Sequence, residues 1–244
     1  MKILIPTAKE LNTQVAQIEP ESLSEKTKLI IRALSQYSVT DLAQLYQIRP
    51  EKAEEEYQRI QELQNETAAI YPALYLFDGL MYRNIKRKDL SKEEEQYIRN
   101  HLLITSSLYG VIPALAPIAP HRLDFMTKLK VEKQSLKKLW TESYGQAVAD
   151  QEILLSLLSS EFEDVFPKEV RDKMIRFKFM EEKDGKRKIH STISKKARGQ
   201  FLSYLIENHI TKLSDIKQSS FSGFKFQENL SQEREFVFVK KVDG

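Results

Sequence analysis

The 244-residue sequence contains no cysteine and only four histidines. Without a thiol, the chain cannot form a disulfide, use a catalytic thiolate, ligate an iron–sulfur cluster through cysteine or sense oxidants through a thiol. The sequence also shows no HxxxH or HExxH pattern and no paired-aspartate calcium loop, and its histidines lie far apart, at His101, His121, His190 and His209. We therefore expect no metal site, no cofactor and no disulfide partner.

Long apolar runs are missing as well. No segment approaches the roughly 18–20 apolar residues of a membrane span, and the start, "MKILIPTAKE", lacks the long apolar core of a signal peptide. These absences predict a cytoplasmic protein with no membrane partner. The net charge of +3 is small for this length, so the local distribution of charge must decide whether the chain binds a polyanion.

The hydrophobic residues that are present, 41% of the chain, suffice for a packed core. "KILI" predicts a first strand ended by Pro6, and residues 22–36, 40–48 and the segment from Pro50 predict a helical block over about 22–64. A capping box from Ser91 to Glu94 predicts a further helix. "YGVIPALAPIAPHRLDF" predicts an extended loop, and "FMTKLKV" after it predicts a strand.

Two hairpins complete the pattern. "MIRFKFMEEKDGKRKIHSTI" alternates on both sides of an Asp184-Gly185 turn, and "FKFQENLSQEREFVFVKK" predicts a second hairpin at the C-terminus. Because strands, helices and hairpins are interspersed, we predict a single domain over residues 1–244. Its fold class is α+β, or mixed α/β, with a mixed β-sheet surrounded by many helices.

The strongest charge asymmetry lies between Lys183 and Arg198, where seven basic residues face one acid. Ser194 is a suitable N-cap for a helix, which places Lys195, Lys196 and Arg198 in a first turn that disfavours cations by about 0.3–1 kcal/mol each. Gly199 inside the same helix costs about 1 kcal/mol relative to Ala. Because functional sites tend to break local rules, we predict an anion or phosphate site on this helix, Gly199 included.

Further candidates stand outside this helix. Lys9 follows the first strand, where open α/β sheets place ligands, although a lone lysine is often only solvent-facing. Arg122 and Asp124 lie two apart at a predicted strand start, so they either share a ligand or form a surface ion pair. The hairpin tip is either a solvated charge run or an extension of the site, through Lys186, Arg187 and Lys188.

With these residues identified, the sequence resembles the YaaA family of bacterial peroxide-stress proteins. The resemblance covers nearly the whole chain and rests on the order and spacing of several segments: "KILIPTAKELN", "LFDGLMYRNI", "LYGVIPALAPIAPHRLDF", "LLSLLSSEF", "KKARG" and "LIENHITKLSDI". It departs from the family pattern at Thr7, an apparent insertion or replacement, at Glu10 in place of threonine, at His121 in place of tyrosine and at Asp124 in place of glutamate.

The resemblance implies a mixed α/β fold with a positively charged cleft, binding to double-stranded or distorted DNA, and a role in limiting free intracellular iron under hydrogen peroxide. It also implies a helix-hairpin-helix element, which falls on residues 40–64. That segment has no glycine in "QIRPEK" to bring backbone N–H groups to phosphate, and Glu54, Glu55 and Glu56 would repel DNA if they faced it.

Two other functions fit the same residues. The cleft could belong to an enzyme acting on a phosphorylated or nucleotide-like small molecule, with Lys9 or Lys196 as acid or base. The sequence has no GxGxxG, Walker-type or GxSxG signature, a test that detects only known enzyme motifs. A closed, deep pocket would favour the enzyme, and a long open groove would favour DNA binding. A protein that binds iron or an iron-containing ligand is the other alternative, which the histidine spacing does not favour.

Overall fold

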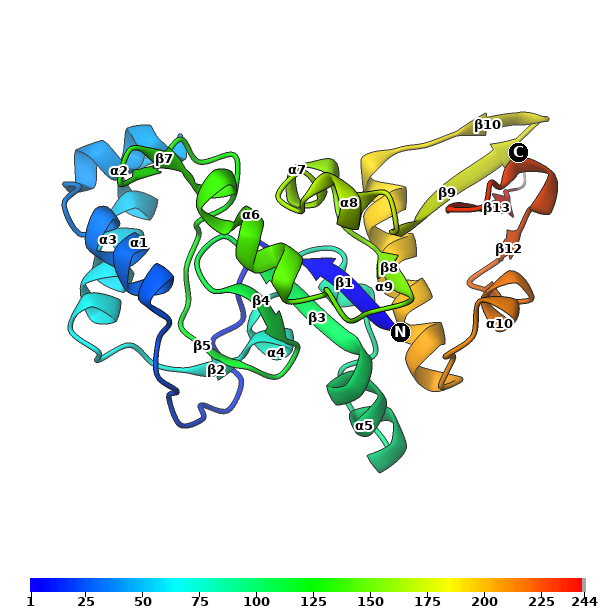
Figure 1. The fold of residues 1–244 in the computed structure, drawn as a ribbon, viewed down its shortest axis with the longest axis horizontal. Helices are drawn as coiled ribbons and strands as arrows, with labels where there is room; N and C mark the ends of the chain where they lie inside the picture. The colour runs from blue at the N-terminus through cyan, green and yellow to red at the C-terminus, as the bar shows by residue number, and fades with distance from the viewer. Residues whose placement is uncertain (243–244) are drawn as a thin grey trace.

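The computed structural model describes residues 1–242, and its centre is a mixed nine-stranded sheet (Figure 1). Eight strands follow one another in the spatial order β11 (Ser220–Phe221), β12 (Phe224–Phe226), β13 (Glu235–Lys241), β9 (Ile175–Lys183), β8 (Leu154–Ser156), β1 (Lys2–Pro6), β3 (Leu102–Ser106) and β4 (Gly110–Pro113). The ninth, β10 (Lys186–Lys188), pairs with the end of β9. The single-domain α/β prediction is confirmed in its fold class.

The middle of the sheet is parallel and its two ends are antiparallel. Strand β1 lies between β3 and β8 and runs parallel to both, and β9 runs parallel to β8 and β13. Strands β4 and β12 pair antiparallel with β3 and β13. The chain thus continues from β1 to strands on one side and later returns to build the other side, which makes β1 the point where the strand order reverses.

Helices cover both faces of the sheet. They are α1 (Glu25–Leu34), α2 (Val39–Tyr46), α3 (Pro50–Gln64), α4 (Ala73–Leu76), α5 (Lys92–His101), α6 (Leu136–Gln146), α7 (Ser160–Glu163), α8 (Lys168–Arg171), α9 (Ser191–Glu207) and α10 (Leu213–Lys217), with 3₁₀ turns η1 (Tyr82–Asn84) and η2 (Glu228–Leu230). Ile3 and Ile5 pack in one core cluster with Phe201 of α9, whereas Leu4 packs in the other with Ile30 of α1. This alternation is what a strand buried on both faces requires.

Two sequence expectations about the middle of the chain are wrong. The proline-rich segment contains β4 and the short β5 (Pro117–Ile118), which pairs with β2 (Tyr71–Pro72). The strand expected over residues 125–131 shrinks to β6 (Lys130–Val131), paired with β7 (Gln134–Ser135). The Asp124 carboxylate accepts hydrogen bonds from the backbone of Met126 and Thr127, and this local turn replaces the extended backbone.

The start of α9 also differs from the sequence prediction. His190, in extended backbone, is the N-cap and makes no side-chain cap hydrogen bond, while the Ser194 backbone N–H already donates to the His190 carbonyl oxygen at 2.9 Å. Ser194 is therefore not the N-cap. Lys195, Lys196 and Arg198 lie beyond the first turn, where the unfavourable effect of the helix dipole on a cation has largely decayed.

Candidate functional site

A cleft of about 580 Å³ lies beyond the carboxyl ends of β1 and β8. Its walls come from the loop after β1, the loop from Gly79 to Tyr82, the segment from Arg122 to Asp124, the start of α7 and the first turns of α9. Figure 1 shows α7 and α9 near the middle of the molecule, on either side of α8. A cleft at the strand where the order reverses is the usual ligand site of an open α/β sheet.

Four cations predicted from sequence line this cleft: Lys9, Arg122, Lys195 and Arg198. Lys195 and Arg198 are three residues apart on α9 and so share one face of the helix. The side chain of the half-buried Arg198 makes no hydrogen bond or ion pair with any residue between 1 and 242. Burial lowers the pKa of its guanidinium, and the nearby Glu163 carboxylate opposes that shift, but an arginine stays charged at neutral pH.

Carboxylates enter the same cleft. Lys9 Nζ lies 2.6 Å from Oδ2 of the buried Asp124. The other Asp124 oxygen accepts from the backbone N–H of Met126 at 3.0 Å and from the backbone and hydroxyl of Thr127 at 2.9 Å each. Asp124 therefore pairs with Lys9 and not with Arg122, and its position is fixed by backbone donors.

Glu161 is the functional candidate that the sequence prediction missed. It lines the cleft from α7, and within residues 1–242 no group hydrogen-bonds its carboxyl. Burial raises its pKa, the Asp124 charge raises it further, and Lys9, Lys137 and Lys195 act in the opposite direction. "SSEFEDVF" offers no spacing signal for this role, because the carboxyl reaches the cleft only through tertiary structure.

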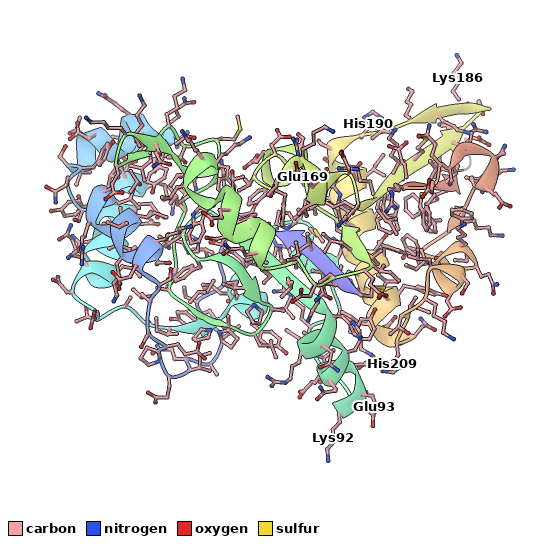
Figure 2. All side chains as sticks on the ribbon, viewed as in Figure 1. Lys92, Glu93, Glu169, Lys186, His190 and His209 are labelled. Atoms are coloured by element: carbon pink, nitrogen blue, oxygen red, sulfur yellow. The ribbon has the colours of Figure 1, made fainter. Side chains whose placement is uncertain are left out.

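Several predicted site residues lie elsewhere. Lys196 is exposed and does not line the cleft. Gly199 faces η1, where a Cβ atom would stand 2.2 Å from the Met81 carbonyl oxygen, so it packs α9 against that turn. The tip residues Lys186, Arg187 and Lys188 project from β10; Figure 2 shows Lys186 at its outer end, away from the body of the protein.

Packing behind the cleft positions Arg198. Glu163, whose charge faces Arg198, accepts hydrogen bonds from Ser156 Oγ at 2.5 Å and Arg176 Nε at 2.7 Å. On the other side, Gly199 allows α9 to approach η1, and Ser203 Oγ donates to the Asn84 carbonyl oxygen at 3.0 Å. Arg198 is thus held at the edge of the cleft by its neighbours rather than by a partner of its own.

His121 is a core residue rather than a site residue. It is buried, its Nδ1 lies 3.0 Å from the Ala119 carbonyl oxygen, and its ring packs against Phe77 and Tyr109. Burial lowers its pKa to about 4. The imidazole is consequently neutral at physiological pH.

The segment predicted as a helix-hairpin-helix forms two helices, α2 and α3, joined by residues 47–49. Glu56 points inward, where it is buried and pairs with Arg59, and burial raises its pKa. Glu54 and Glu55 are exposed on α3. Contact of this pair of helices with DNA stays a prediction.

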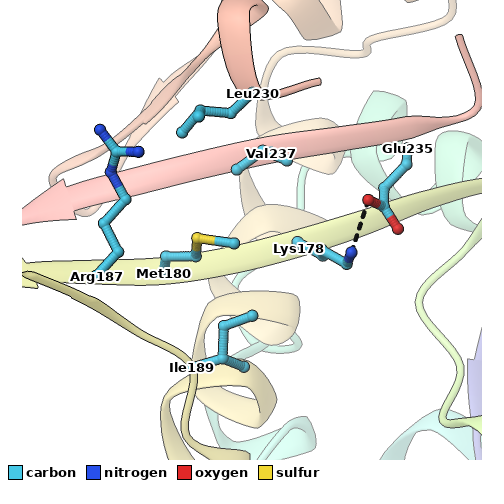
Figure 3. A pocket seen from close by; sticks show the side chains of 7 residues that line it. All are labelled: Lys178, Met180, Arg187, Ile189, Leu230, Glu235 and Val237. Carbon is cyan, nitrogen blue, oxygen red and sulfur yellow. Dashed lines mark ion pairs between the residues drawn. The ribbon is translucent and has the colours of Figure 1, made fainter. Parts of the chain in front are cut away.

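A second depression, of about 500 Å³, lies on the outer face of β9 and β13 (Figure 3). Its cations already have partners: Lys178 Nζ lies 2.7 Å from Glu235, and Arg187 Nε lies 2.7 Å from Glu182. Met180, Val237 and the exposed Ile189 supply apolar surface. Paired cations make this depression a weaker anion site than the cleft.

Residues 1–242 contain no group of three or more His, Asp or Glu side chains arranged to hold a metal ion. In the same part of the chain, no helix has the length and apolar character needed to cross a bilayer.

Fold and site define an α/β protein with a cleft of mixed charge at the point where its sheet reverses strand order. The chain belongs to the family described as peroxide stress protein YaaA, whose model matches residues 1–230. This membership supports a role in peroxide stress. The chain is similar to UPF0246 proteins of Streptococcus gordonii (96% identical, all of both chains), Streptococcus sanguinis (56%, 99% of this chain and all of the relative) and Streptococcus pneumoniae strain CGSP14 (54%, with the same coverage).

Proposed function

We propose that this protein acts in the cytoplasm during peroxide stress by binding double-stranded or distorted DNA through backbone phosphates at the cleft. The observation that carries the proposal is Arg198, a half-buried cation at the cleft that no hydrogen bond or ion pair from residues 1–242 satisfies. Buried guanidinium groups are normally paired, and a phosphate offers the bidentate acceptor that their geometry suits.

Lys195, Arg122 and Lys9 add to this site. Lys195 shares the helix face of Arg198, and Arg122 makes no ion pair or hydrogen bond through its side chain within residues 1–242. Lys9 is more than half exposed although it pairs with Asp124, so a phosphate can approach it from the open side. The proposal that the protein also limits free intracellular iron is supported by the family resemblance.

The test is a salt titration of duplex binding. Replacing Lys195 and Arg198 by Ala should flatten the slope of log affinity against log salt by about 0.9 for each phosphate that the variant no longer binds, with little dependence on DNA sequence. Replacing Lys186 and Lys188 by Ala removes the same charge outside the cleft and serves as the matched control. A slope for the Lys195 and Arg198 double variant equal to that of wild type would show that duplex DNA does not touch this helix.

A second candidate function is an enzyme acting on a phosphorylated or nucleotide-like small molecule. The observation that favours it is the pair of cleft carboxylates, Asp124 and Glu161. Asp124 lies beside Lys9, and Glu161 has a raised pKa and no hydrogen-bond or ion-pair partner within residues 1–242. Two results together would establish the enzyme in place of DNA binding at the cleft. Every cleft variant would keep wild-type duplex binding, and the wild-type protein would turn over such a molecule.

A further inference from the structure

The size of the cleft differs from that of a groove for duplex DNA. Its volume of about 580 Å³ falls in the range of about 300–1,000 Å³ typical of small-molecule sites. A duplex contacts a protein over many phosphates along its length. The interior can therefore hold one compact unit, while a longer polyanion can contact only the rim.

The two cations on α9 and the carboxylates of the cleft come from different elements of the fold. Arg198 and Lys195 stand on α9, whereas Asp124 and Glu161 come from other walls of the cleft, and Lys9 already neutralises Asp124. A phosphate chain running through the interior would pass the Glu161 carboxylate, which no ion pair within residues 1–242 neutralises and whose charge repels it. A ligand with one phosphate near α9 and a neutral hydrogen-bond donor near the carboxylates matches this arrangement.

The remaining walls suit a flat apolar ring. Leu80, Met81, Leu123 and Phe162 all line the cleft. Both Asp124 oxygens are already engaged, by Lys9 and by the turn at Met126 and Thr127, and Glu10 pairs with Arg83. Within residues 1–242, Glu161 is the carboxylate of the cleft that no hydrogen bond or ion pair engages. Nucleobases combine a flat π-surface with N–H donors at their edges, and a carboxylate accepts from such donors.

We propose that the cleft accepts a single nucleotide unit, with its phosphate on Arg198 and Lys195, its base between the apolar walls and a base N–H donating to Glu161. This proposal rests on the proposed function, because it uses the same cations for phosphate. The unit is either a nucleotide extruded from a duplex or a free mononucleotide, since both present the same chemistry.

Direct binding of deoxyadenosine 5′-monophosphate, deoxyadenosine and inorganic phosphate to the wild-type protein tests the nucleotide class. The monophosphate should bind about tenfold or more tightly than either fragment, because only it reaches both sides of the cleft. Inorganic phosphate that binds as tightly as the monophosphate would overturn the proposal, since the base would then contribute nothing.

Variants of Glu161 test the base contact. Glu161→Ala should lower the ratio of monophosphate to phosphate affinity by about fivefold or more, and Glu161→Gln, which keeps an acceptor oxygen, should restore most of it. Both variants remove the negative charge of Glu161 and so raise the affinity for any anion. The ratio of monophosphate to phosphate affinity cancels this shared effect. A ratio unchanged in Glu161→Ala would contradict the assigned contact.

A variant whose cleft is filled by a large side chain distinguishes nucleotide binding in the interior from duplex binding at the rim. Ser159 lines the cleft and makes no side-chain cap hydrogen bond, so Ser159→Trp fills the interior without changing charge, and Ser159→Ala is its control. We expect Ser159→Trp to abolish monophosphate binding while duplex binding keeps its salt slope. A duplex with a central 2-aminopurine shows whether the bound nucleotide is extruded from DNA. If it is, the fluorescence of 2-aminopurine should rise when wild type binds and should not rise with Ser159→Trp.

The outcomes are distinguishable. Monophosphate binding without a 2-aminopurine signal assigns the site to free nucleotide and overturns extrusion. Duplex binding with a normal salt slope but no monophosphate binding and no 2-aminopurine signal overturns the nucleotide site and leaves the proposed function standing. Monophosphate binding without any duplex binding overturns the proposed function instead. The wild-type measurements decide these cases even where Ser159→Trp fails to fold.

Discussion

Replacing Gly199 by Ala should destabilise the protein although Ala is the better helix former. In the middle of α9 the exchange would gain about 1 kcal/mol from helix propensity alone. The added Cβ, however, would lie 2.2 Å from the Met81 carbonyl oxygen and 2.8 Å from Asn84 Cβ. Because one obstacle is backbone, η1 must move away from α9 by about 1 Å to restore ordinary contact distances.

The size of the loss follows from what that movement breaks. Overpacking costs about 1–3 kcal/mol, and displacement of η1 also weakens the hydrogen bonds of Ser203 Oγ with the Asn84 carbonyl at 3.0 Å and the Lys86 N–H at 2.8 Å. We expect a net loss of about 2–3 kcal/mol, which lowers the melting temperature by about 5–10 °C for a chain of this size.

Thermal melting with urea denaturation measures this loss. Lys196→Ala, an exposed change on the same helix, is the matched control and should melt like wild type. Duplex binding should weaken in Gly199→Ala, because Met81 and its neighbours form a wall of the cleft. A Gly199→Ala protein that melts at or above the wild-type temperature would refute the assignment of Gly199 to close packing.

Three further predictions concern charge. The pKa of His121 is about 4 in the folded state and about 6.5 in the unfolded chain, so the unfolded chain takes up the proton first as pH falls. Urea titrations should therefore show the free energy of unfolding falling by about 3 kcal/mol between pH 6.5 and 4, and by less in His121→Gln. Because Glu161 has a raised pKa, its protonation as pH falls should strengthen phosphate binding, a pH dependence that calorimetry should find reduced in Glu161→Gln. Asp124→Asn should free the Lys9 charge and steepen the salt slope by up to about 0.9, while melting records the cost of the altered turn; a flatter slope would contradict it.

Local signals explain which parts of the fold could be predicted from sequence. The Asp184-Gly185 hairpin is confirmed, with φ of 51° and 72° at the two turn residues, as the type I′ turn of such a dipeptide requires. The capping box of Ser91 and Glu94 is confirmed at the start of α5. The predicted start of α9 was wrong because residues 191–193 carry no apolar periodicity, so Ser194 offered the stronger local signal.

The site could be predicted where a residue stood at a strand end or broke a local rule of helix structure. The cleft brings together Lys9, predicted from the end of the first strand, Lys195 and Arg198, predicted from the α9 segment, and Arg122, predicted from its spacing to Asp124. Gly199 broke a helix rule for packing rather than for a ligand, a distinction that depends on where Met81 lies in space. Glu161 had no signal at all, because its role arises from burial beside Asp124. Phosphate binding by these residues stays a prediction.

A structure of the protein bound to a short duplex with one unpaired adenine is the most direct test of phosphate binding at Arg198. We expect a phosphate oxygen about 2.7–2.9 Å from the Arg198 guanidinium, the spacing of a charge-assisted hydrogen bond. The same structure should place the unpaired base between the walls formed by Met81 and Phe162. DNA lying against the β10 hairpin, with Arg198 making no contact to phosphate, would contradict it.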